Sequence, residues 1–366
     1  MHRSIFFLAV LPFALCATAF NPRDYTKKVA RCPGLNRATD QEVALELHYV
    51  DVNPSAERTM LMLHGWPSLW STWKYQIDEF KDDYRLIIPD SRGFGESTHP
   101  GDVKTSGTMP DLVDDLSCIL RDSNVAKAIC VGHDWGTQVC YEAARTRPDL
   151  IEAVVGIAIP YVPSHGPFTP IEALVPHLPR LAYQLAFSSN TQASIEELSR
   201  DVRRTLRGTL RTVDSPPPAE FLLSSNSFME GWKGVAEIPP IPFFTPDEED
   251  YMVEQYFIQR FNHTLYFYQD EARYASWKAA QEHGEFRVFQ PVLSILPTQD
   301  PVADWVLAAS LLSSAQFLPD LEQKAIPGAH WVHIEHPVEV NAIMREWLGR
   351  LGVGNKDGER KTRDEL

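Results

Sequence analysis

The sequence contains few cysteines, and no apolar run in it is long enough for a comfortable membrane span. Five cysteines occur among 366 residues, with no Cys-x-x-Cys pair and no Cys/His spacing typical of a metal site. Cys118, Cys130 and Cys140 lie in apolar segments, so we expect small buried side chains there rather than a disulfide framework. Cys32 is the one predicted to lie in an exposed loop. Since a membrane-spanning helix needs ~20 apolar residues, we expect no stable membrane span.

Basic side chains are outnumbered by acidic ones. The 34 Lys and Arg against 49 Asp and Glu give a net charge of -15, which excludes the clustered positive charge of a nucleic-acid-binding surface. Such a balance favours a protein that acts on neutral or apolar small molecules. A hydrophobic content of 44% is ordinary for a globular chain and excludes disorder and collagen-like repeats. A complete dinucleotide-binding fingerprint is also missing, because residues 90–97 lack its third glycine, and we interpret them as a structural turn.

The two ends of the chain carry targeting patterns. A basic start, an apolar stretch over residues 4–15 and the small residues Ala17-Thr18-Ala19 are typical of a cleaved signal peptide, with an uncleaved anchor as the alternative. Cys16 lies inside that signal. The last four residues, Arg-Asp-Glu-Leu, match the ER-retrieval pattern except at the first position. Together these patterns predict a resident of the ER lumen, with secretion as the alternative, and an Asn262-His263-Thr264 sequon is compatible with either.

Strands alternate with helices in the first part of the chain. Segment 43–52 has the alternation of an exposed edge strand, and continuous apolar runs predict buried strands elsewhere. The predicted buried strands are 59–63, 85–89, 127–131 and 151–159, and the predicted helices are 70–80, 110–122 and 136–147. This order predicts an α/β fold with a mostly parallel sheet covered by helices on both faces.

The strand pattern disappears between residues 161 and 285. This segment holds twelve of the 28 prolines and shows helical periodicity, so we interpret it as an inserted helical cap. The helical segments are 174–187, 195–210 and 247–261; strands resume at 290–296 and 323–326, and a closing helix follows at 338–351. The predicted organisation is a signal peptide (1–19), one core domain in two parts (20–160 and 286–353), a cap (161–285) and a hydrophilic tail (354–366).

The motif Gly132-His133-Asp134-Trp135-Gly136 lies between a predicted buried strand and a predicted helix. Small residues two positions before and after Asp134 permit the sharp turn of a nucleophile elbow, which holds its middle side chain out at the top of the sheet. Asp134 takes the place that a lipase gives to serine. The alternative is a glycine-flanked loop whose aspartate caps the following helix.

Three further motifs suit the same architecture. His64-Gly65-Trp66-Pro67 closes strand 59–63, where the backbone N–H of Trp66 is placed for an oxyanion hole, and Trp135 supplies the second N–H. Asp300 follows strand 290–296 and His330 follows strand 323–326, which gives the order nucleophile, acid, histidine of α/β-hydrolases.

Three neighbours of His330 suggest a metal site at first sight. His333, Glu335 and His336 lack the helical His-Glu-x-x-His spacing of a zinc enzyme, and we interpret them as a solvated or capping cluster.

From about residue 43 to residue 351, insertion included, the chain resembles the epoxide hydrolase family of the α/β-hydrolase fold. The resemblance rests on His-Gly-Trp-Pro at 64–67 and on Gly-His-Asp-Trp-Gly at 132–136. It implies that Asp134 is the nucleophile, Asp300 the acid and His330 the general base.

The resemblance also implies two acids on the cap. They are Tyr183, within Ala-Tyr-Gln-Leu, and Tyr268, within Tyr-Phe-Tyr-Gln, and Tyr266 is the alternative for the second.

An aspartate nucleophile suits epoxide opening. A carboxylate with an ordinary pKa of ~3.9 is ionised at neutral pH and attacks a tetrahedral carbon without help from a base. Phenols on the cap stabilise the leaving alkoxide, and His330, oriented by Asp300, activates the water that hydrolyses the ester on Asp134. The expected partners are a small-molecule epoxide and water, the product is a vicinal diol, and no metal or cofactor is required. Lipid, xenobiotic and secondary-metabolite epoxides, polyketides among them, are all candidate substrates.

Two other functions remain open. A haloalkane or haloacid dehalogenase uses the same nucleophile, but the haloalkane enzymes often place a halide-binding Asn where this chain has Trp66. A non-catalytic ligand-binding protein on the same fold does not need Asp134, Asp300 and His330 together. The motifs therefore favour the epoxide hydrolase.

Overall fold

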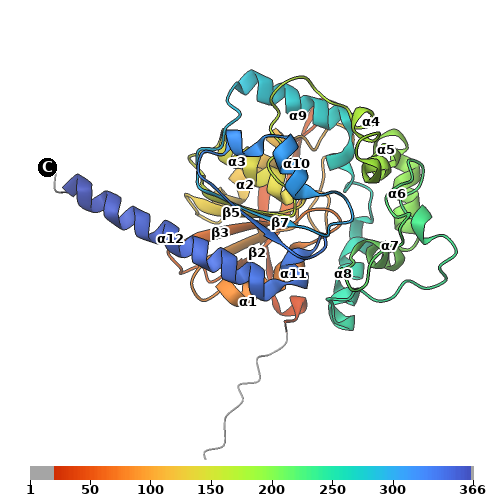
Figure 1. Cartoon of the computed structure of the whole chain (residues 1–366), viewed down its shortest axis with the longest axis horizontal. Helices are drawn as coiled ribbons and strands as arrows, with labels where there is room; N and C mark the ends of the chain where they lie inside the picture. The colour runs from red at the N-terminus through yellow and green to blue at the C-terminus, as the bar shows by residue number, and fades with distance from the viewer. Residues whose placement is uncertain (1–19, 364–366) are drawn as a thin grey trace, which may run out of the picture.

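An eight-stranded sheet forms the centre of the computed structural model, which describes residues 20–363 (Figure 1). The predicted signal peptide and residues 364–366 of the retrieval-like tail lie outside the described residues. The strands are β1 (Lys27–Asn36), β2 (Gln41–Val52), β3 (Thr59–Leu63), β4 (Arg85–Pro89), β5 (Ala128–His133), β6 (Ile151–Ile157), β7 (Val292–Pro297) and β8 (Leu321–Ile326). Their order in the sheet is β1-β2-β4-β3-β5-β6-β7-β8. The β1–β2 and β2–β4 pairs are antiparallel and the remaining pairs are parallel, which confirms the mostly parallel sheet.

The edge of the sheet differs from the prediction. Strand β2 is an interior strand, because β1 pairs with its residues 41–50 and forms the edge, while β4 pairs with its residues 49–52 on the other side. Strand β1 was not predicted, since its sequence Lys-Lys-Val-Ala-Arg-Cys-Pro-Gly-Leu-Asn is polar and carries Pro33 and Gly34. Charged side chains and proline are what protects an exposed sheet edge from further pairing, and they also remove the apolar pattern of a strand.

Helices cover both faces of the sheet, as predicted. Neighbouring residues of one strand point to opposite faces, so that Leu61 and Leu63 pack into the apolar layer that includes α2 and α3, while Met60 and Met62 pack into the layer that includes α1 and α12. The core helices are α1 (Lys74–Phe80), α2 (Met109–Asp122), α3 (Trp135–Thr146), α10 (Trp305–Leu311), α11 (Val332–Glu335) and α12 (Pro337–Arg363). Short 3₁₀ helices cover Pro22–Asp24, Trp70–Trp73, Pro179–Leu181, Glu230–Trp232, Tyr266–Tyr268 and Ser314–Phe317.

The closing helix is longer than the sequence pattern indicated. Helix α12 continues to Arg363, past the predicted end at residue 351, and its C-terminal part extends away from the core in Figure 1. The apolar periodicity that marks a packed helix stops where the helix leaves the core. None of the helices within residues 20–363 has both the length and the apolar character needed to cross a membrane.

The inserted segment between β6 and β7 forms the cap. Its helices are α4 (Ile171–Leu174), α5 (Ala182–Ser189), α6 (Thr191–Arg200), α7 (Val202–Thr209), α8 (Pro246–Gln259) and α9 (Asp270–His283). Figure 1 shows α4 to α8 side by side on one side of the core. The predicted helix 195–210 is divided at Asp201, whose side chain accepts the Arg204 N–H and caps α7. Proline likewise divides segment 174–187, since Pro179 begins a separate 3₁₀ turn before α5.

Two disulfides hold the core together, and the expectation of unpaired buried thiols is wrong. Cys32 on β1 bonds Cys118 on α2 with a Cα–Cα distance of 5.8 Å, and Cys130 on β5 bonds Cys140 on α3 at 5.5 Å. The first bond joins residues that are 86 positions apart in the sequence. A loop of this length lowers the conformational entropy of the unfolded chain and so stabilises the folded state by about 4.5 kcal/mol. All four side chains are also buried, so burial and pairing occur together, and only the folded arrangement shows the pairing.

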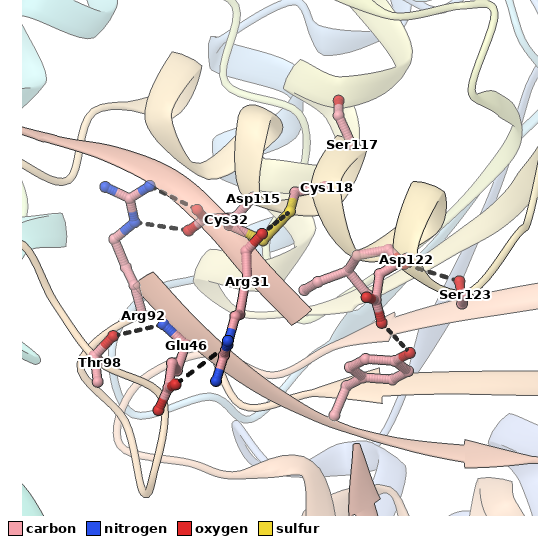
Figure 2. Close-up of a disulfide and its surroundings, with 12 residues drawn as sticks. Arg31, Cys32, Glu46, Arg92, Thr98, Asp115, Ser117, Cys118, Asp122 and Ser123 are labelled. Atoms are coloured by element: carbon pink, nitrogen blue, oxygen red, sulfur yellow. Dashed lines mark hydrogen bonds and ion pairs between the residues drawn. A yellow bond between two sulfur atoms is a disulfide. The ribbon is translucent and has the colours of Figure 1, made fainter. Parts of the chain in front are cut away.

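Residues 90–97 form a structural turn, as the missing third glycine indicated. Arg92 donates two hydrogen bonds to Asp115 of α2, at 2.6 and 2.7 Å, beside the Cys32–Cys118 bond (Figure 2). Gly93 and Gly95 have φ of 79° and 53°, which favours glycine at both positions. The turn therefore fastens the end of β4 to helix α2.

Candidate active site

The turn between β5 and α3 has the geometry of a nucleophile elbow. Asp134 has φ 54° and ψ -124°, a conformation that is rare for a residue with a Cβ atom. A Cβ at Gly136 would lie 2.2 Å from the carbonyl oxygen of Leu63, and one at Gly132 would lie 2.5 Å from the Gly136 backbone. Only glycine fits at both places. The Asp134 side chain makes no capping hydrogen bond to α3, in contrast to the helix-cap alternative.

The loop after β3 holds one oxygen of the Asp134 carboxylate. The backbone N–H of Trp66 donates to Asp134 Oδ1 at 2.8 Å. A Cβ at Gly65 would lie 2.3 Å from the same oxygen, so glycine is required for this close approach. Trp135 is the first residue of α3, and its backbone N–H belongs to the N-terminus of that helix.

Asp300 and His330 reach the elbow from the ends of β7 and β8. His330 Nδ1 lies 2.6 Å from Asp300 Oδ2, and His330 Nε2 lies 3.5 Å from Asp134 Oδ2. Asp300 Oδ1 also accepts the backbone N–H of Val302 at 2.8 Å, and Oδ2 accepts the indole N–H of Trp305 at 2.6 Å. The imidazole thus lies between two carboxylates.

This arrangement shifts the pKa of both His330 and Asp134. Burial alone lowers the pKa of His330, but the charge of Asp300 and the hydrogen bond with Asp134 outweigh burial and raise it to about 10. Burial raises the pKa of Asp134, and the hydrogen bond and charge of His330 outweigh it and keep the pKa below its ordinary value. In the free protein at neutral pH, Asp134 is therefore ionised and His330 is protonated.

Two further histidines lie directly behind His330. The His133 ring packs on His333 with ring centroids 4.2 Å apart, and His133 Nε2 lies 2.9 Å from the His330 carbonyl oxygen. Burial lowers the pKa of His133 to about 3 and lowers that of His333 as well. Because these rings stay neutral, they add no positive charge beside His330.

The interpretation of the residues after His330 as a solvated or capping cluster is wrong for His333. His333 is fully buried. Glu335 accepts the backbone N–H of Ala329 and the backbone N–H of Val213 on the cap, each at 2.7 Å, so it fastens the cap to the loop that carries His330. No group of three His, Cys, Asp or Glu side chains in the described part of the chain is arranged to hold a metal ion.

A cavity of about 70 Å³ lies above Asp134, between the core and the cap. Both predicted cap tyrosines, Tyr183 on α5 and Tyr268 after α8, line it together with Asp134 and His330. Most of the remaining wall is apolar or aromatic; it includes Trp66, Trp135, Phe221, Leu222, Phe228, Val302, Trp305 and Trp331. Tyr266 packs instead against Phe94 and His99. The cavity therefore brings together four of the five predicted side chains, and the fifth, Asp300, lies behind His330 with no exposed surface.

The two phenols stay protonated. Burial and the nearby charge of Asp134 raise the pKa of Tyr183, and burial together with Tyr183 and Asp134 raises that of Tyr268. The two rings lie 5.8 Å apart between centroids, and Gln184 donates to the Tyr183 hydroxyl at 3.3 Å. Both hydroxyls are thus available as hydrogen-bond donors over the working pH range of most enzymes.

Trp305 is the contact that sequence reasoning missed at this site. It occupies the first position of α10, and its indole reaches Asp300 only through the folded loop. A tryptophan five residues after the acid has no local signature of such a contact. The sequence around Trp305 indicates at most a short apolar helix, and it does not indicate which group the indole contacts.

Comparison with known proteins agrees with this geometry. A family model described as the alpha/beta hydrolase fold matches residues 58–337. The chain is 26% identical over 310 residues to bifunctional epoxide hydrolase 2 of Rattus norvegicus, covering 83% of this chain and 53% of that protein. It is 28% identical over 333 residues to an epoxide hydrolase of Neurospora crassa, covering 85% and 94%. With epoxide hydrolase A of Mycobacterium tuberculosis the identity is 27% over 320 residues, covering 84% and 95%. The chain thus spans about half the length of the mammalian bifunctional relatives.

Solved structures show the same fold. An epoxide hydrolase from an endophytic Streptomyces superposes with a TM-score of 0.75 at 24% identity, covering 89% of this chain and 96% of that chain. Epoxide hydrolase A of Mycobacterium thermoresistibile superposes with a TM-score of 0.72 at 24% identity, covering 88% and 98%. At this identity the agreement concerns the arrangement of the backbone, cap included.

Proposed function

The chain belongs to the alpha/beta hydrolase fold family, and within it we propose an epoxide hydrolase that forms a vicinal diol through an ester on Asp134. One observation carries the proposal. A strained elbow presents Asp134 to a largely apolar cavity, with His330 on one side and two phenols, Tyr183 and Tyr268, on the cap side. The epoxide hydrolases among the relatives and the solved structures support it.

The first step opens the ring. Asp134 Oδ2 attacks an epoxide carbon, while the Trp66 N–H holds Oδ1 and keeps the carboxylate oriented. The C–O bond to the epoxide oxygen breaks and the electron pair goes to that oxygen. Tyr183 and Tyr268 donate hydrogen bonds to the developing alkoxide, and one of them transfers its proton.

The second step hydrolyses the ester. Once Asp134 is esterified it carries no charge, so one of the two carboxylates that raise the pKa of His330 is removed. His330 then gives up its proton more readily, and this proton replaces the one that a cap phenol lost in the first step. Neutral His330 next takes a proton from the water whose oxygen attacks the ester carbonyl. When the ester C–O bond breaks, the diol oxygen takes the second water proton and Asp134 returns to a carboxylate. Asp300 holds the imidazole and stabilises its positive charge. The oxyanion on Asp134 is stabilised by the N–H of Trp66 and, at the start of α3, by that of Trp135.

The cavity favours an uncharged, largely apolar epoxide. Aromatic and aliphatic side chains form most of its wall, and the ionised groups within it, Asp134 and His330, are those of the reaction itself. An anionic substrate would meet the charge of Asp134 in a buried site without a dedicated cation on the wall. Lipid, xenobiotic and secondary-metabolite epoxides all meet this requirement.

The dehalogenase alternative fits the cavity less well. The indole N–H of Trp66 donates to Thr264 of the cap at 3.2 Å and is not free to bind a leaving halide. A panel of apolar epoxides and haloalkanes, analysed for diols and for released halide, tests the proposal directly. Diol formation is expected. Halide release without diol formation from any epoxide would show that the protein is a dehalogenase.

The cap phenols provide a prediction of their own. We expect Tyr183→Phe and Tyr268→Phe each to slow ring opening by roughly 10- to 100-fold, and the double variant by on the order of 10³-fold, because the alkoxide loses its proton donors. Pre-steady-state formation of the ester measures this step. Tyr266→Phe is the matched control, since Tyr266 packs against Phe94 and His99 rather than on the cavity. If Tyr266→Phe impairs ring opening and Tyr268→Phe does not, the assignment of the second acid is wrong.

We further propose that the protein works in the ER lumen. Besides the targeting patterns of the sequence, both disulfides support an oxidising compartment, and the four cysteines of the described residues are all paired. Asn262 of the sequon is exposed on the loop between α8 and Tyr266–Tyr268.

Asn262 therefore serves as a reporter of compartment. When the full chain is expressed in eukaryotic cells, we expect one glycan that endoglycosidase H removes, and Asn262→Gln should abolish the shift on a gel. Thr264→Ala is a poor choice, because the Thr264 hydroxyl accepts the Trp66 indole N–H. An unglycosylated chain that added protease degrades in intact microsomes would contradict lumenal residence.

A further inference from the structure

We propose that Trp305 is a positioning residue that acts through Asp300 and controls how readily His330 releases its proton during ester hydrolysis. The inference rests on the proposed function. The indole Nε1 of Trp305 donates to Asp300 Oδ2 at 2.6 Å, and the same oxygen lies 2.6 Å from His330 Nδ1. One carboxylate oxygen therefore serves two N–H donors, of which only the imidazole belongs to the reaction.

The contact is built into a rigid and dry part of the structure. The Asp300 side chain has no exposed surface, so its hydrogen bonds are not exchanged for bonds to bulk water. The Val302 N–H holds the other oxygen at 2.8 Å, which fixes the rotation of the carboxylate. Asp304 caps α10 by accepting the Leu307 N–H, and this fixes the helix start that carries Trp305.

The effect on His330 has a definite sign. A hydrogen bond to Asp300 is stronger when the carboxylate charge is uncompensated, which is the case when His330 is neutral. The Trp305 N–H therefore stabilises the neutral state of His330 more than the protonated state, and it lowers the pKa of His330 relative to a protein that lacks it. His330 must be neutral to activate water, so Trp305 increases the fraction of ester complexes that are ready to hydrolyse.

Other groups around His330 do not duplicate this role. Asp134 faces it from the elbow and loses its charge on esterification. His133 packs against it from β5, and His333 of α11 packs on the His133 ring; both are neutral, and the neutral phenols of Tyr183 and Tyr268 face the imidazole from the cap. Asp300 is then the remaining charge in contact with the imidazole, and Trp305 is the side chain that modulates it.

The test compares two tryptophans whose indole N–H groups each donate a hydrogen bond, one to Asp300 and one away from the cavity. Trp305→Phe keeps an aromatic ring in the cavity wall and removes the N–H. We expect ester hydrolysis in single turnovers to show an acid limb that is shifted to higher pH by roughly one unit, with ester formation changed less than about twofold. Trp277→Phe is the matched control, because the Trp277 indole donates to the Gly166 carbonyl at 2.9 Å and does not line the cavity, so the acid limb should stay in place. Trp305→Leu serves the same comparison if the phenylalanine variant is unstable.

A readout in the free protein separates this inference from the proposed function. The His330 Nδ1 proton in its 2.6 Å contact should give a far-downfield NMR resonance, assigned by its loss in Asp300→Asn. We expect Trp305→Phe, but not Trp277→Phe, to move that resonance. If the resonance moves but no epoxide is hydrolysed, the proposed function fails and the positioning role stands. An unmoved resonance, or an acid limb that stays in place or shifts to lower pH, would overturn the role of Trp305.

Discussion

Asp134→Ala is expected to abolish diol formation, with a loss of at least about 10⁴-fold in turnover. The variant has no carboxylate at the elbow, so neither the SN2 attack nor the ester is available. His330 alone could deliver water directly to the epoxide, but the variant lacks the carboxylate that the Trp66 N–H orients, so no attacking atom is held at the elbow. Chiral chromatography of diols from a responsive epoxide measures the loss.

The control for this variant must distinguish lost chemistry from lost fold. Asp320→Ala removes an exposed carboxylate before β8, far along the chain from the elbow, and should retain full turnover. Thermal unfolding should show Asp134→Ala to be folded, since removing a buried, strained side chain at φ 54° leaves the surrounding sheet intact. If Asp134→Ala keeps more than about a hundredth of wild-type turnover, water attacks the epoxide directly and the ester mechanism is wrong.

The elbow was predictable because its requirements are local. The glycines at 132 and 136, the buried strand before them and the helix after them all lie within a few residues, and each has a steric reason that the sequence displays. The positions of Asp300 and His330 could be predicted for a related reason. In a parallel sheet the carboxyl ends of the strands meet at one edge, so residues that follow two adjacent strands approach each other.

The features that were missed depend on partners distant in sequence. Cys32 and Cys118 are separated by 86 residues, and an apolar surrounding is compatible with a thiol as well as with a disulfide. His333 was expected in a solvated or capping cluster, yet it is buried and packs against His133 from another element. Strand β1 has no apolar pattern that would reveal it in the sequence. Its pairing with β2 and its disulfide to α2 stabilise it instead.

The cap shows both cases within one segment. The apolar periodicity predicted that the segment is helical. The division into separate helices depended on Pro179 and Asp201, which interrupt a helix without changing the apolar periodicity on either side. Which tyrosine faces the nucleophile was not decided by the residues alone. Tyr266 and Tyr268 lie on one short 3₁₀ turn, where side chains two positions apart point in different directions, and in the structure only the second of the two lines the cavity.

His330→Gln is expected to separate the two halves of the reaction and to trap the ester. Asp134 loses its partner at 3.5 Å, so its pKa returns towards the ordinary value, but it remains ionised at pH 7 and still opens the epoxide. Hydrolysis loses its general base and should slow by on the order of 10³-fold. Each enzyme molecule then opens one epoxide and accumulates as the ester, which hydrolyses slowly.

Mass spectrometry of the intact variant and of its peptides identifies the trapped species. The peptide that contains Asp134 should gain the mass of one intact epoxide, because ring opening adds the substrate without a leaving group. The double variant Asp134→Ala/His330→Gln is the control and should gain nothing. An ester found on Asp300 or another carboxylate would reassign the nucleophile, and the absence of added mass together with full loss of diol would place His330 in the first step. Either result would change the mechanism in a specific way, because the 2.6 Å contact to Asp300 and the 3.5 Å contact to Asp134 give the two nitrogens of His330 different partners.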